Sequence, residues 1–345
     1  MYYNKMALNS STPLDKARLR EAWTKTMARH EMLRTGFVQL HDHAHPFAMI
    51  TYRAGIDLPW QETQNSLSAS QEQAVLQNLH RPPWKILIDQ CGSVTTVHFS
   101  ALHALYDAQS LQSIFADVLA AYDGKPFAEL APLSDTLGPI LIASEKQSEH
   151  SQEFWQGLAA DFKSVKFPDL HPTRITEKFL VIRSARCSRP LPELESACRD
   201  AGVTLQAAGQ AAWGRLLAAI TGEQNVTFGT VLSGRNLSHT AQDAVFPCLV
   251  TVPSLIDTNC TNRELLKLTL KRNASLTKHQ FTPLGKIQKW LGSDEPLFDT
   301  LFVYQKFAKQ TATTSINWEV VDEETKIDVS IRALPCWTLL LLLAY

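Results

Sequence analysis

The sequence predicts an α/β fold, an α+β sandwich built as two lobes, from its length and from the mixed periodicities in both halves. At 345 residues the chain is longer than one hydrophobic core usually supports, so two packed lobes are expected. Each half combines helical spacing of apolar residues with short extended runs. We place an N-terminal lobe at residues 1–166 and a C-terminal lobe at residues 167–345.

The first half predicts a helix, a hairpin and two paired strands. Residues 14–30 carry apolar side chains at helical spacing, and Asp15 stands near the start as a cap. A short extended run at residues 37–40 is followed by HDHAHP, which is typical of a hairpin tip. The apolar runs 84–90 and 93–100 flank a Cys-Gly pair, so we expect them to be two consecutive strands.

Further elements follow with the same alternation. Apolar residues recur at helical spacing from Ser110 until Gly124, which is typical of a residue that ends a helix. Residues 124–150 are rich in turn residues and predict only short helical pieces, and FPDLHP predicts a crossover between lobes. The second half predicts strands and helices at residues 178–188, 204–221, 226–234, 262–278 and 298–306.

The composition is that of a globular protein without a strong charge of either sign. Lys and Arg number 33 against 34 Asp and Glu, which argues against nucleic-acid or anionic-membrane partners. The six cysteines are scattered without a C-x-x-C pair, which favours reduced thiols over a disulfide framework or a zinc site. The N-terminus lacks the apolar stretch of a signal peptide, and Leu339–Leu343 is too short to span a bilayer. We therefore expect a soluble, cytoplasmic protein.

One short segment carries chemistry. HALYD places His103 and Asp107 four residues apart, directly after an apolar strand and directly before a helix. A neutral imidazole held at a strand end can accept or relay a proton near pH 7, and the carboxylate can fix the local geometry without reacting. Because H-x-x-x-D matches are frequent by chance, the pattern alone leaves open that His103 is a packed histidine without a catalytic role.

HALYDAQSL resembles the core motif of condensation domains of nonribosomal peptide synthetases, in which two histidines are followed by three variable residues and Asp-Gly. The similarity is greatest to the HHALYD form of fungal siderophore synthetases. Other stretches resemble further motifs of this family in the same order along the chain. These stretches are residues 29–37, 227–236, 245–253, 279–288 and 297–305.

This resemblance implies a fold and a mode of action. The fold is two chloramphenicol acetyltransferase-like lobes arranged as a V, with a tunnel between them. His103 is the catalytic residue: it orients the acceptor nucleophile, acts as its base or stabilises the tetrahedral intermediate. Asp107 is structural and pairs with Arg34, and breaking one side of such a buried pair costs roughly 3–5 kcal/mol.

The resemblance also implies partners and cofactors. The partners are donor and acceptor peptidyl carrier domains, with adenylation domains of a synthetase as further partners. The domain itself binds no cofactor and no metal, because its substrates arrive on the phosphopantetheine arms of the carriers. The product is an amide or an ester in the biosynthesis of a nonribosomal peptide such as a siderophore.

Several residues depart from the family pattern. Leu102 replaces the first motif histidine, and Ala108 replaces the motif glycine. Val250 stands where asparagine is usual, and Gly285 where arginine is usual. The last residues, ALPCWTLLLLLAY, resemble nothing in the family, so we expect the C-terminal lobe to be incomplete at its end and the chain to be truncated at both ends.

These departures leave two other functions open. The chain is then a noncatalytic or degenerate condensation-domain fragment that acts only as a carrier-docking or structural module. Alternatively, it is a stand-alone acyl-CoA acyltransferase of the same fold, although the DFGWG string of the plant enzymes does not occur. The alternating His41, His43 and His45 match a divalent-ion site less well than a solvated loop.

Overall fold

The computed structural model describes most of the chain. The chain forms two compact units, and each unit is made of three segments that are separate in the sequence. The described residues are 3–10, 13–42, 46–63, 75–91, 94–146, 148–164, 180–237, 240–304, 316, 318–324, 329–334 and 338–344. The first unit comprises Met1–Leu137, Ser238–Cys248 and Gln310–Lys326. The second comprises Gly138–Leu237, Leu249–Lys309 and Ile327–Tyr345.

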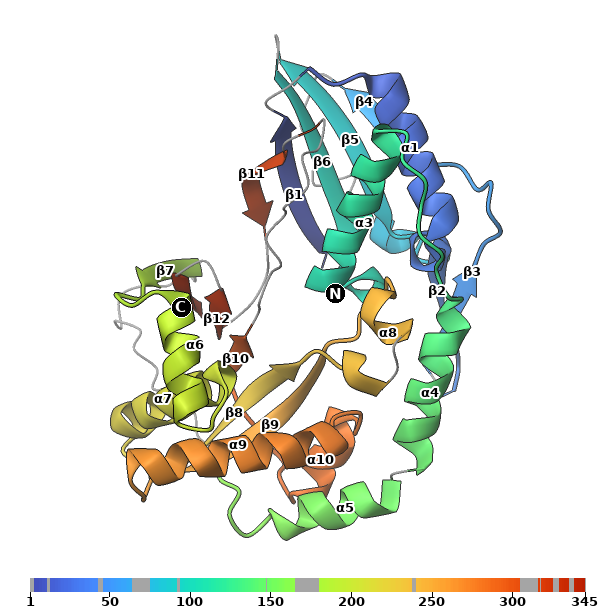
Figure 1. Ribbon diagram of the computed structural model, residues 1–345. Helices are drawn as coiled ribbons and strands as arrows, with labels where there is room; N and C mark the ends of the chain where they lie inside the picture. Colours follow the sequence, from blue (N-terminus) through green and yellow to red (C-terminus); the bar gives the residue numbers. More distant parts are fainter. Residues whose placement is uncertain are drawn as a thin grey trace, which may run out of the picture. The chain divides into compact units, whose positions relative to one another are not determined.

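The first unit is built on a sheet of five strands in the order β11-β1-β6-β5-β4 (Figure 1). Strand β6 lies between β1 and β5 and is antiparallel to both. Two helices, α1 and α3, pack against each other beside this sheet. The strands are β1 Tyr3–Ser10, β4 Trp60–Thr63, β5 Trp84–Cys91, β6 Val94–Leu102 and β11 Trp318–Glu324, and the helices are α1 Lys16–Arg29 and α3 Ala108–Tyr122.

An aromatic cluster joins these helices to the sheet. Trp23 of α1 stacks on Phe99 of β6 with the ring centroids 5.6 Å apart, and both side chains are at most 2% exposed. Phe115 of α3 meets Trp23 and Phe99 edge to face, at 5.7 Å from each. Such aromatic pairs contribute beyond the apolar area that they bury, so they fix the helices against the strand that leads to the H-x-x-x-D segment.

The link between α1 and β5 contains a short helical turn and a hairpin. The turn η1 Glu31–Arg34 runs into β2 Thr35–Gln39, which pairs with β3 Phe47–Thr51. Gly36 of β2 lies so close to the backbone carbonyl of His80 that a Cβ would overlap its oxygen. The glycine in the RTG sequence is therefore explained by a close approach of two backbone segments.

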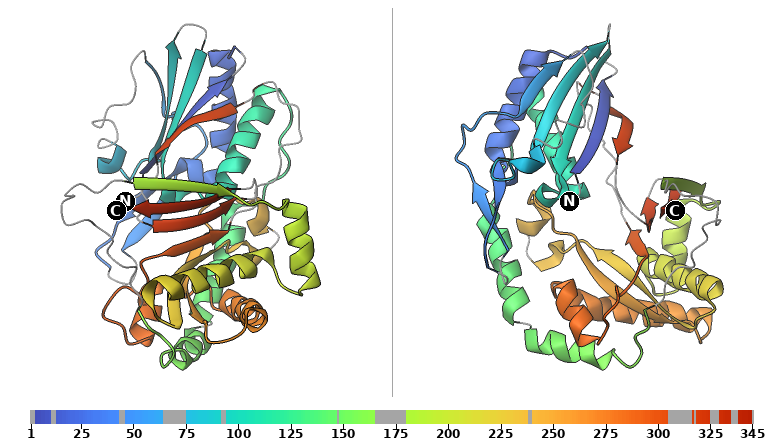
Figure 2. Two further views of the ribbon diagram at one scale, coloured as in Figure 1. Left: turned by 90° about the vertical axis from the view of Figure 1, so that its left-hand side faces the viewer. Right: turned by 180° about the vertical axis from the view of Figure 1, so that it is seen from behind.

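The second unit contains a sheet of six strands in the order β7-β13-β12-β10-β8-β9 (Figure 2). Helices α7 Leu205–Thr221 and α9 Asn262–Lys278 pack against each other and on this sheet. Their buried contacts include Trp213, Phe228, Leu265 and Phe302. The strands are β7 Leu180–Arg186, β8 Asn225–Leu232, β9 Val250–Asp257, β10 Leu301–Tyr304, β12 Val329–Leu334 and β13 Thr338–Ala344.

Helices α7 and α9 of the second unit both begin at residues that are typical helix caps, and α7 also ends at one. Helix α7 begins after Thr204, whose hydroxyl accepts a hydrogen bond from the Ala207 amide, and ends at Gly222, where φ is 77°. Helix α9 begins with a capping box formed by Thr261 and Glu264. The helices not yet given are α4 Leu133–Lys146, α5 Ser148–Gly157, α6 Leu191–Asp200, α8 Thr240–Asp243 and α10 Leu284–Trp290, with the short turns η2 His103–Leu105 and η3 Arg235–Leu237.

Most elements expected from periodicity are confirmed. The helix expected at residues 14–30 is α1, those at 204–221 and 262–278 are α7 and α9, and the paired strands are β5 and β6. The short helical pieces expected at residues 124–150 are two longer helices, α4 and α5. Strand β1 and the C-terminal strands were not expected from the sequence, and β13 includes the leucine run of the tail.

The division of the chain differs from the expected pair of consecutive lobes. The expected boundary at residues 166 and 167 lies outside the described residues. The chain instead first passes from the first unit to the second after Leu137, and two later segments of the chain belong to the first unit. The reason is that β11 completes the edge of the first sheet by pairing with β1, and that Ser238–Cys248 binds at the start of α3.

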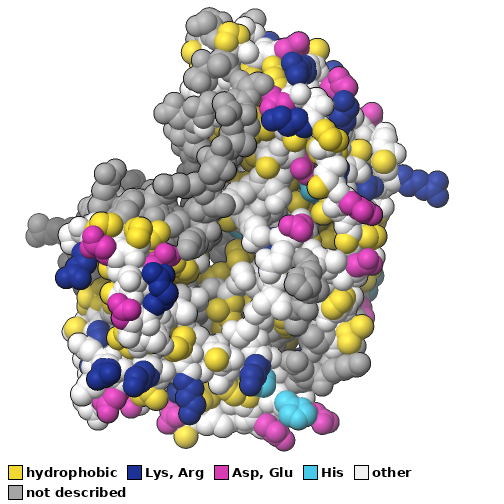
Figure 3. Space-filling view, viewed as in Figure 1, with side chains coloured by type: hydrophobic (Ala, Val, Ile, Leu, Met, Phe, Trp, Pro, Cys, Tyr) yellow, Lys and Arg dark blue, Asp and Glu magenta, His cyan; other side chains and the backbone are white. Residues whose placement is uncertain are grey.

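The described surface has the mixed charge that the near-neutral composition predicts, and the cysteines whose side chains are described form no disulfide with one another. Figure 3 shows Lys and Arg side chains interspersed with Asp and Glu side chains. Cys187, Cys198, Cys248 and Cys260 carry free thiols. Within the described ranges, no helix has both the length and the apolar character needed to cross a bilayer.

Candidate active site

The H-x-x-x-D segment lies where the central strand of the first unit ends. Strand β6 finishes at Leu102, which is paired with Tyr3 of β1, and His103 begins the short turn η2. Helix α3 then starts at Ala108, with Asp107 as its N-cap. The placement of His103 between a strand end and a helix start is therefore as the sequence predicts.

Asp107 organises the start of α3. Its side chain is 1% exposed and accepts hydrogen bonds from the Ser110 amide and hydroxyl, each at 2.8 Å. Its other oxygen accepts a hydrogen bond at 3.1 Å from the amide of Cys248, a residue 141 positions later. Asp107 is thus both a helix cap and the attachment point of a distant part of the chain.

That distant part is Ser238–Cys248, which we call the return segment. The Ser110 hydroxyl accepts a hydrogen bond from the Phe246 amide at 3.1 Å, and its oxygen also lies 2.9 Å from the Phe246 carbonyl. Its one hydrogen is therefore shared between that carbonyl and Asp107. The Gln109 amide group donates to the Gln242 carbonyl at 2.7 Å. The start of α3 therefore has its geometry fixed from two directions, by its own helix and by the return segment.

His103 itself is half-buried and stacks on a tyrosine. Its ring lies 5.0 Å from the ring of Tyr106, with 16° between the two planes. In the part of the chain that the structure describes, no hydrogen bond is formed by either ring nitrogen of His103. One face of the imidazole is thus covered by Tyr106, while its two ring nitrogens keep their hydrogen-bonding capacity with respect to the described residues.

The pair implied between Arg34 and Asp107 is not formed among the described residues. The Arg34 guanidinium donates instead to the backbone carbonyl of Tyr52, next to β3, and its Nε is buried without a partner. Asp107 has its oxygens directed at Ser110 and Cys248. The physical reason is that the amide and hydroxyl donors at the start of α3 already bind the carboxylate of Asp107, and the positive end of the helix dipole favours its charge.

The departures from the family motif lie in different surroundings. Leu102 is 6% exposed, and its amide donates to the Pro83 carbonyl at 2.9 Å. Val250 begins β9 and pairs with Leu232. Gly285 lies in α10 with open space where a side chain would start. A leucine at position 102 offers the neighbouring His103 no hydrogen bond from its side chain.

The RHEMLRTGF stretch contributes a second polar cluster, between α1 and α3. Asp117 of α3 accepts hydrogen bonds from Arg29 Nε at 2.8 Å and from His30 Nε2 at 2.7 Å. Burial acts to raise the pKa of Asp117, but the hydrogen bond and charge of His30, together with Arg29, outweigh it and hold that pKa below its ordinary value. Arg29 is therefore part of an internal ion pair.

Replacing Asp117 with asparagine is expected to lower the free energy of unfolding by about 1–2 kcal/mol at pH 7, because two charged hydrogen bonds weaken. The depressed pKa of Asp117 means that its stabilisation is present above about pH 4 and is lost as the pH falls through the folded-state pKa. Urea unfolding of Asp117→Asn and of the unmodified chain, measured from pH 7 down to pH 3, should show the difference shrinking below about pH 4.

The exposed pair of Lys163 and Glu223 supplies the control. Glu223→Gln should change the free energy of unfolding by less than about 1 kcal/mol at every pH, because exposed pairs are screened by solvent. A pH-independent loss in Asp117→Asn would contradict the role given to the Asp117 charge.

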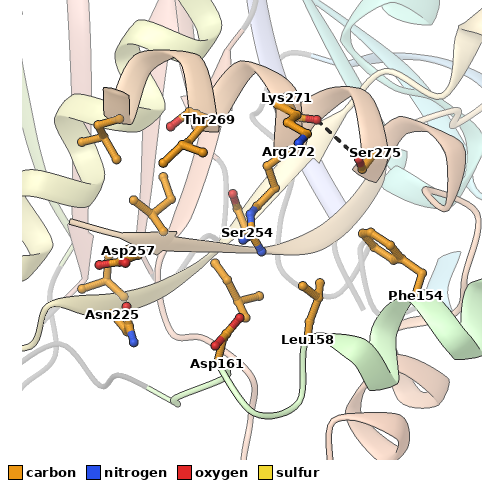
Figure 4. A pocket seen from close by; sticks show the side chains of 15 residues that line it. Phe154, Leu158, Asp161, Asn225, Ser254, Asp257, Thr269, Lys271, Arg272 and Ser275 are labelled. Atoms are coloured by element: carbon orange, nitrogen blue, oxygen red, sulfur yellow. Dashed lines mark hydrogen bonds between the residues drawn. The ribbon is translucent and has the colours of Figure 1, made fainter. Parts of the chain in front are cut away.

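The second unit contains a cavity of about 430 Å³, shown in Figure 4. Arg272 of α9 extends into it toward Ser254 of β9, and its Nη1 is buried without a hydrogen-bond partner among the described residues. Burial lowers the pKa of Arg272, while Asp161 and Asp257 act in the opposite direction. The lining also includes Lys271, so two cationic side chains stand against the carboxylates of Asp161 and Asp257, and the charges give no net preference for an anionic ligand.

The metal and histidine expectations concern residues that the structure describes only in part. His43 and His45 lie outside the described residues, and His41 is exposed after β2. Among the residues that the structure describes, no group of three His, Cys, Asp or Glu side chains is placed to hold a metal ion.

Comparison with known proteins identifies sequence relatives. A family model described as "Condensation domain" matches residues 1–335. Nonribosomal peptide synthetase sidC of Arthroderma benhamiae is 44% identical over 347 aligned positions, which cover 97% of this chain and 7% of that protein. The hydroxamate-type ferrichrome siderophore peptide synthetase of Schizosaccharomyces pombe is 29% identical, over 84% of this chain and 6% of its own length. The chain thus spans less than a tenth of these relatives.

Solved structures share the fold at low sequence identity. The condensation domain from Monacolin K polyketide synthase MokA matches 99% of this chain and 86% of that chain, with a TM-score of 0.76 and 17% identity. The X-domain from teicoplanin biosynthesis also has a TM-score of 0.76, with 20% identity, over 100% of this chain and 85% of that chain. The two units of this chain therefore have the fold of these proteins.

Proposed function

We propose that this chain, which belongs to the condensation-domain family, joins two carrier-bound acyl groups through an amide bond, with His103 as its catalytic residue. Condensation domains are acyltransferases, and in synthetases they act together with carrier and adenylation domains. The single observation that supports the proposal most directly is the setting of His103: its ring is stacked on Tyr106 just after the end of β6, and no described residue forms a hydrogen bond to its ring nitrogens.

The proposed reaction needs one group that handles a proton. The acceptor amine attacks the carbonyl of the donor thioester, so a C–N bond forms and the C–S bond breaks. The amine loses one proton and the departing thiolate gains one, and no oxidant or reductant is required. An imidazole at His103 can accept the first proton and return it to the sulfur, or donate a hydrogen bond to the intermediate oxyanion. With a hydroxyl acceptor, the same steps give an ester.

The partners proposed are a donor and an acceptor peptidyl carrier domain, each presenting its substrate on a phosphopantetheine arm. The domain itself is proposed to hold no cofactor. The similarity to siderophore synthetases supports a place in siderophore biosynthesis within a larger synthetase. The cytoplasm is the proposed compartment, supported by the scattered cysteines and by the free thiols of those that the structure describes.

The experiment supplies the chain with two carrier domains, one charged with an N-acylated aminoacyl thioester and one with an aminoacyl thioester. A panel of proteinogenic amino acids covers both positions. Intact-protein mass spectrometry should show the acceptor carrier gaining the mass of the donor acyl group while the donor carrier returns to its free thiol.

Three control reactions separate the alternatives. An acceptor carrier with an unacylated arm should gain no amide product, and a hydroxyacyl acceptor tests for the ester. Acetyl-CoA in place of the donor carrier tests for an acyl-CoA acyltransferase. Transfer from acetyl-CoA alone, or no transfer to any acceptor by a folded chain, would refute the proposal.

A further inference from the structure

We infer that Tyr106 is a positioning residue for His103, so that the stacked phenol ring sets the direction in which the imidazole edge points. This inference rests on the proposed catalytic role of His103. Tyr106 occupies one of the three variable positions of the family motif, and its ring lies nearly parallel to the imidazole, 5.0 Å away and tilted by 16°. That separation is within the range of favourable aromatic stacking.

The stack restricts the one torsion that matters for a reacting imidazole. Rotation about the Cβ–Cγ bond of a histidine is broad and only weakly restricted by the side chain itself. A flat ring against one face removes most of that freedom, because turning the imidazole would drive it into the neighbouring ring. The leucine at position 102 provides no hydrogen bond that would do this instead, and no described residue binds the ring nitrogens.

Tyr106 is itself held in place from separate elements. Its side chain is 7% exposed, and its hydroxyl accepts a hydrogen bond at 3.1 Å from Asn4 Nδ2 of β1. Phe99 of β6 packs against its ring edge to face, with the centroids 6.3 Å apart. Because Phe99 belongs to the aromatic cluster with Trp23, the rigidity of the core extends through Tyr106 to His103.

Two kinds of replacement separate the ring from the hydroxyl. Tyr106→Phe keeps the ring and removes the hydroxyl, with its bond to Asn4, whereas Tyr106→Leu and Tyr106→Met remove the ring and keep an apolar side chain. We expect the two non-aromatic variants to lower kcat by about 10-fold to 100-fold, because the imidazole loses its preset direction. We expect Tyr106→Phe to retain kcat within about threefold, because the loss of one neutral hydrogen bond is a modest change.

A merely structural role would not produce this pattern. KM for both carriers should stay within about twofold in the non-aromatic variants, because Tyr106 acts on the reacting group and not on uniform binding. All rates are expressed per folded molecule, from circular dichroism and urea unfolding. The matched control is Tyr122→Leu: Tyr122 lies in α3, is 6% exposed, and its hydroxyl accepts a hydrogen bond from the Asp15 amide. This variant should lose stability without losing kcat.

A spectroscopic readout tests the stack without any substrate. The ring protons of His103, assigned by their absence in His103→Asn, lie over the phenol face and should be shifted upfield by its ring current. The shift should disappear in Tyr106→Leu and Tyr106→Met and persist in Tyr106→Phe and Tyr122→Leu. If neither Tyr106→Leu nor Tyr106→Met folds, Tyr106→Gln replaces them: it also removes the ring but keeps a polar group for Asn4, and it should reduce both the shift and kcat.

The outcomes are distinguishable from those of the proposed function. Full kcat in a folded non-aromatic variant, unmoved His103 resonances, or a loss in Tyr106→Phe equal to that in Tyr106→Leu would overturn the inference and leave the catalytic role of His103 standing. If His103→Ala turns over at the normal rate, the proposed function fails, and the positioning role in catalysis fails with it even where the ring-current shift shows the stack.

Discussion

Replacing His103 with alanine is expected to lower the rate of amide formation by about 10²-fold to 10⁴-fold, the usual contribution of a positioned proton-transfer group. The loss should appear in kcat, because the described contacts of His103 hold its ring and leave its edge to the reacting atoms. The measurement is the rate of acyl transfer between loaded carriers, with the free energy of unfolding determined in parallel.

His279 of the second unit provides a matched control. It is also a partly buried, stacked histidine, with its ring 4.3 Å from Phe154 and its Nδ1 3.1 Å from the Ser151 hydroxyl. His279→Ala should cost stability and leave the rate per folded molecule unchanged. Equal rates in His103→Ala and the unmodified chain would remove the basis for the catalytic assignment and favour a docking or structural module.

Replacing Asp107 with alanine is expected to destabilise the chain by about 3–5 kcal/mol. The cap of α3 is lost, and buried donors at Ser110 and Cys248 are left without an acceptor, at about 1–3 kcal/mol each. Urea unfolding should show a lower midpoint, and acyl transfer should fall in proportion to the folded fraction. Asp107→Asn keeps one acceptor oxygen for the cap and should lose less.

Asp15 supplies the comparison for Asp107. It is likewise the N-cap of a helix and accepts from the Arg18 amide at 3.0 Å, but it is exposed and its bond is local. Asp15→Ala should therefore cost only about 1 kcal/mol. A similar small loss in Asp107→Ala would show that the contact with the return segment adds little to folding.

The local structure around the site could be read from the sequence, and the long-range partners could not. The period of apolar residues and the caps at Asp15 and Thr204 predict α1 and α7, because those signals act within a few residues. The position of His103 between strand and helix follows from the same reasoning. The partner of Asp107 could not be predicted in this way. The Cys248 amide lies 141 positions further along the chain, and a backbone amide can be supplied by almost any residue type, so the sequence does not mark it.

The strands that the sequence did not predict have a related explanation. Residues 3–10 mix polar and apolar side chains without strict alternation, and this segment becomes β1 because β6 and β11 supply hydrogen bonds on its two sides. The tail was set apart because it lacks a family motif, yet it forms β13 between β12 and β7. In both cases the pairing partners decide the structure more than the local propensity does.

The ordering of the chain through its two units has a consequence for protein engineering. Strand β11 and the return segment belong to the first unit, but in the sequence they come after residues that belong to the second unit. A cut placed after Leu137 would leave β1 without its outer neighbour and the α3 cap without the Cys248 amide. Chimeras that exchange halves at that point would have an unpaired edge at β1. Domain exchanges should therefore transfer residues 1–137 together with the return segment and β11.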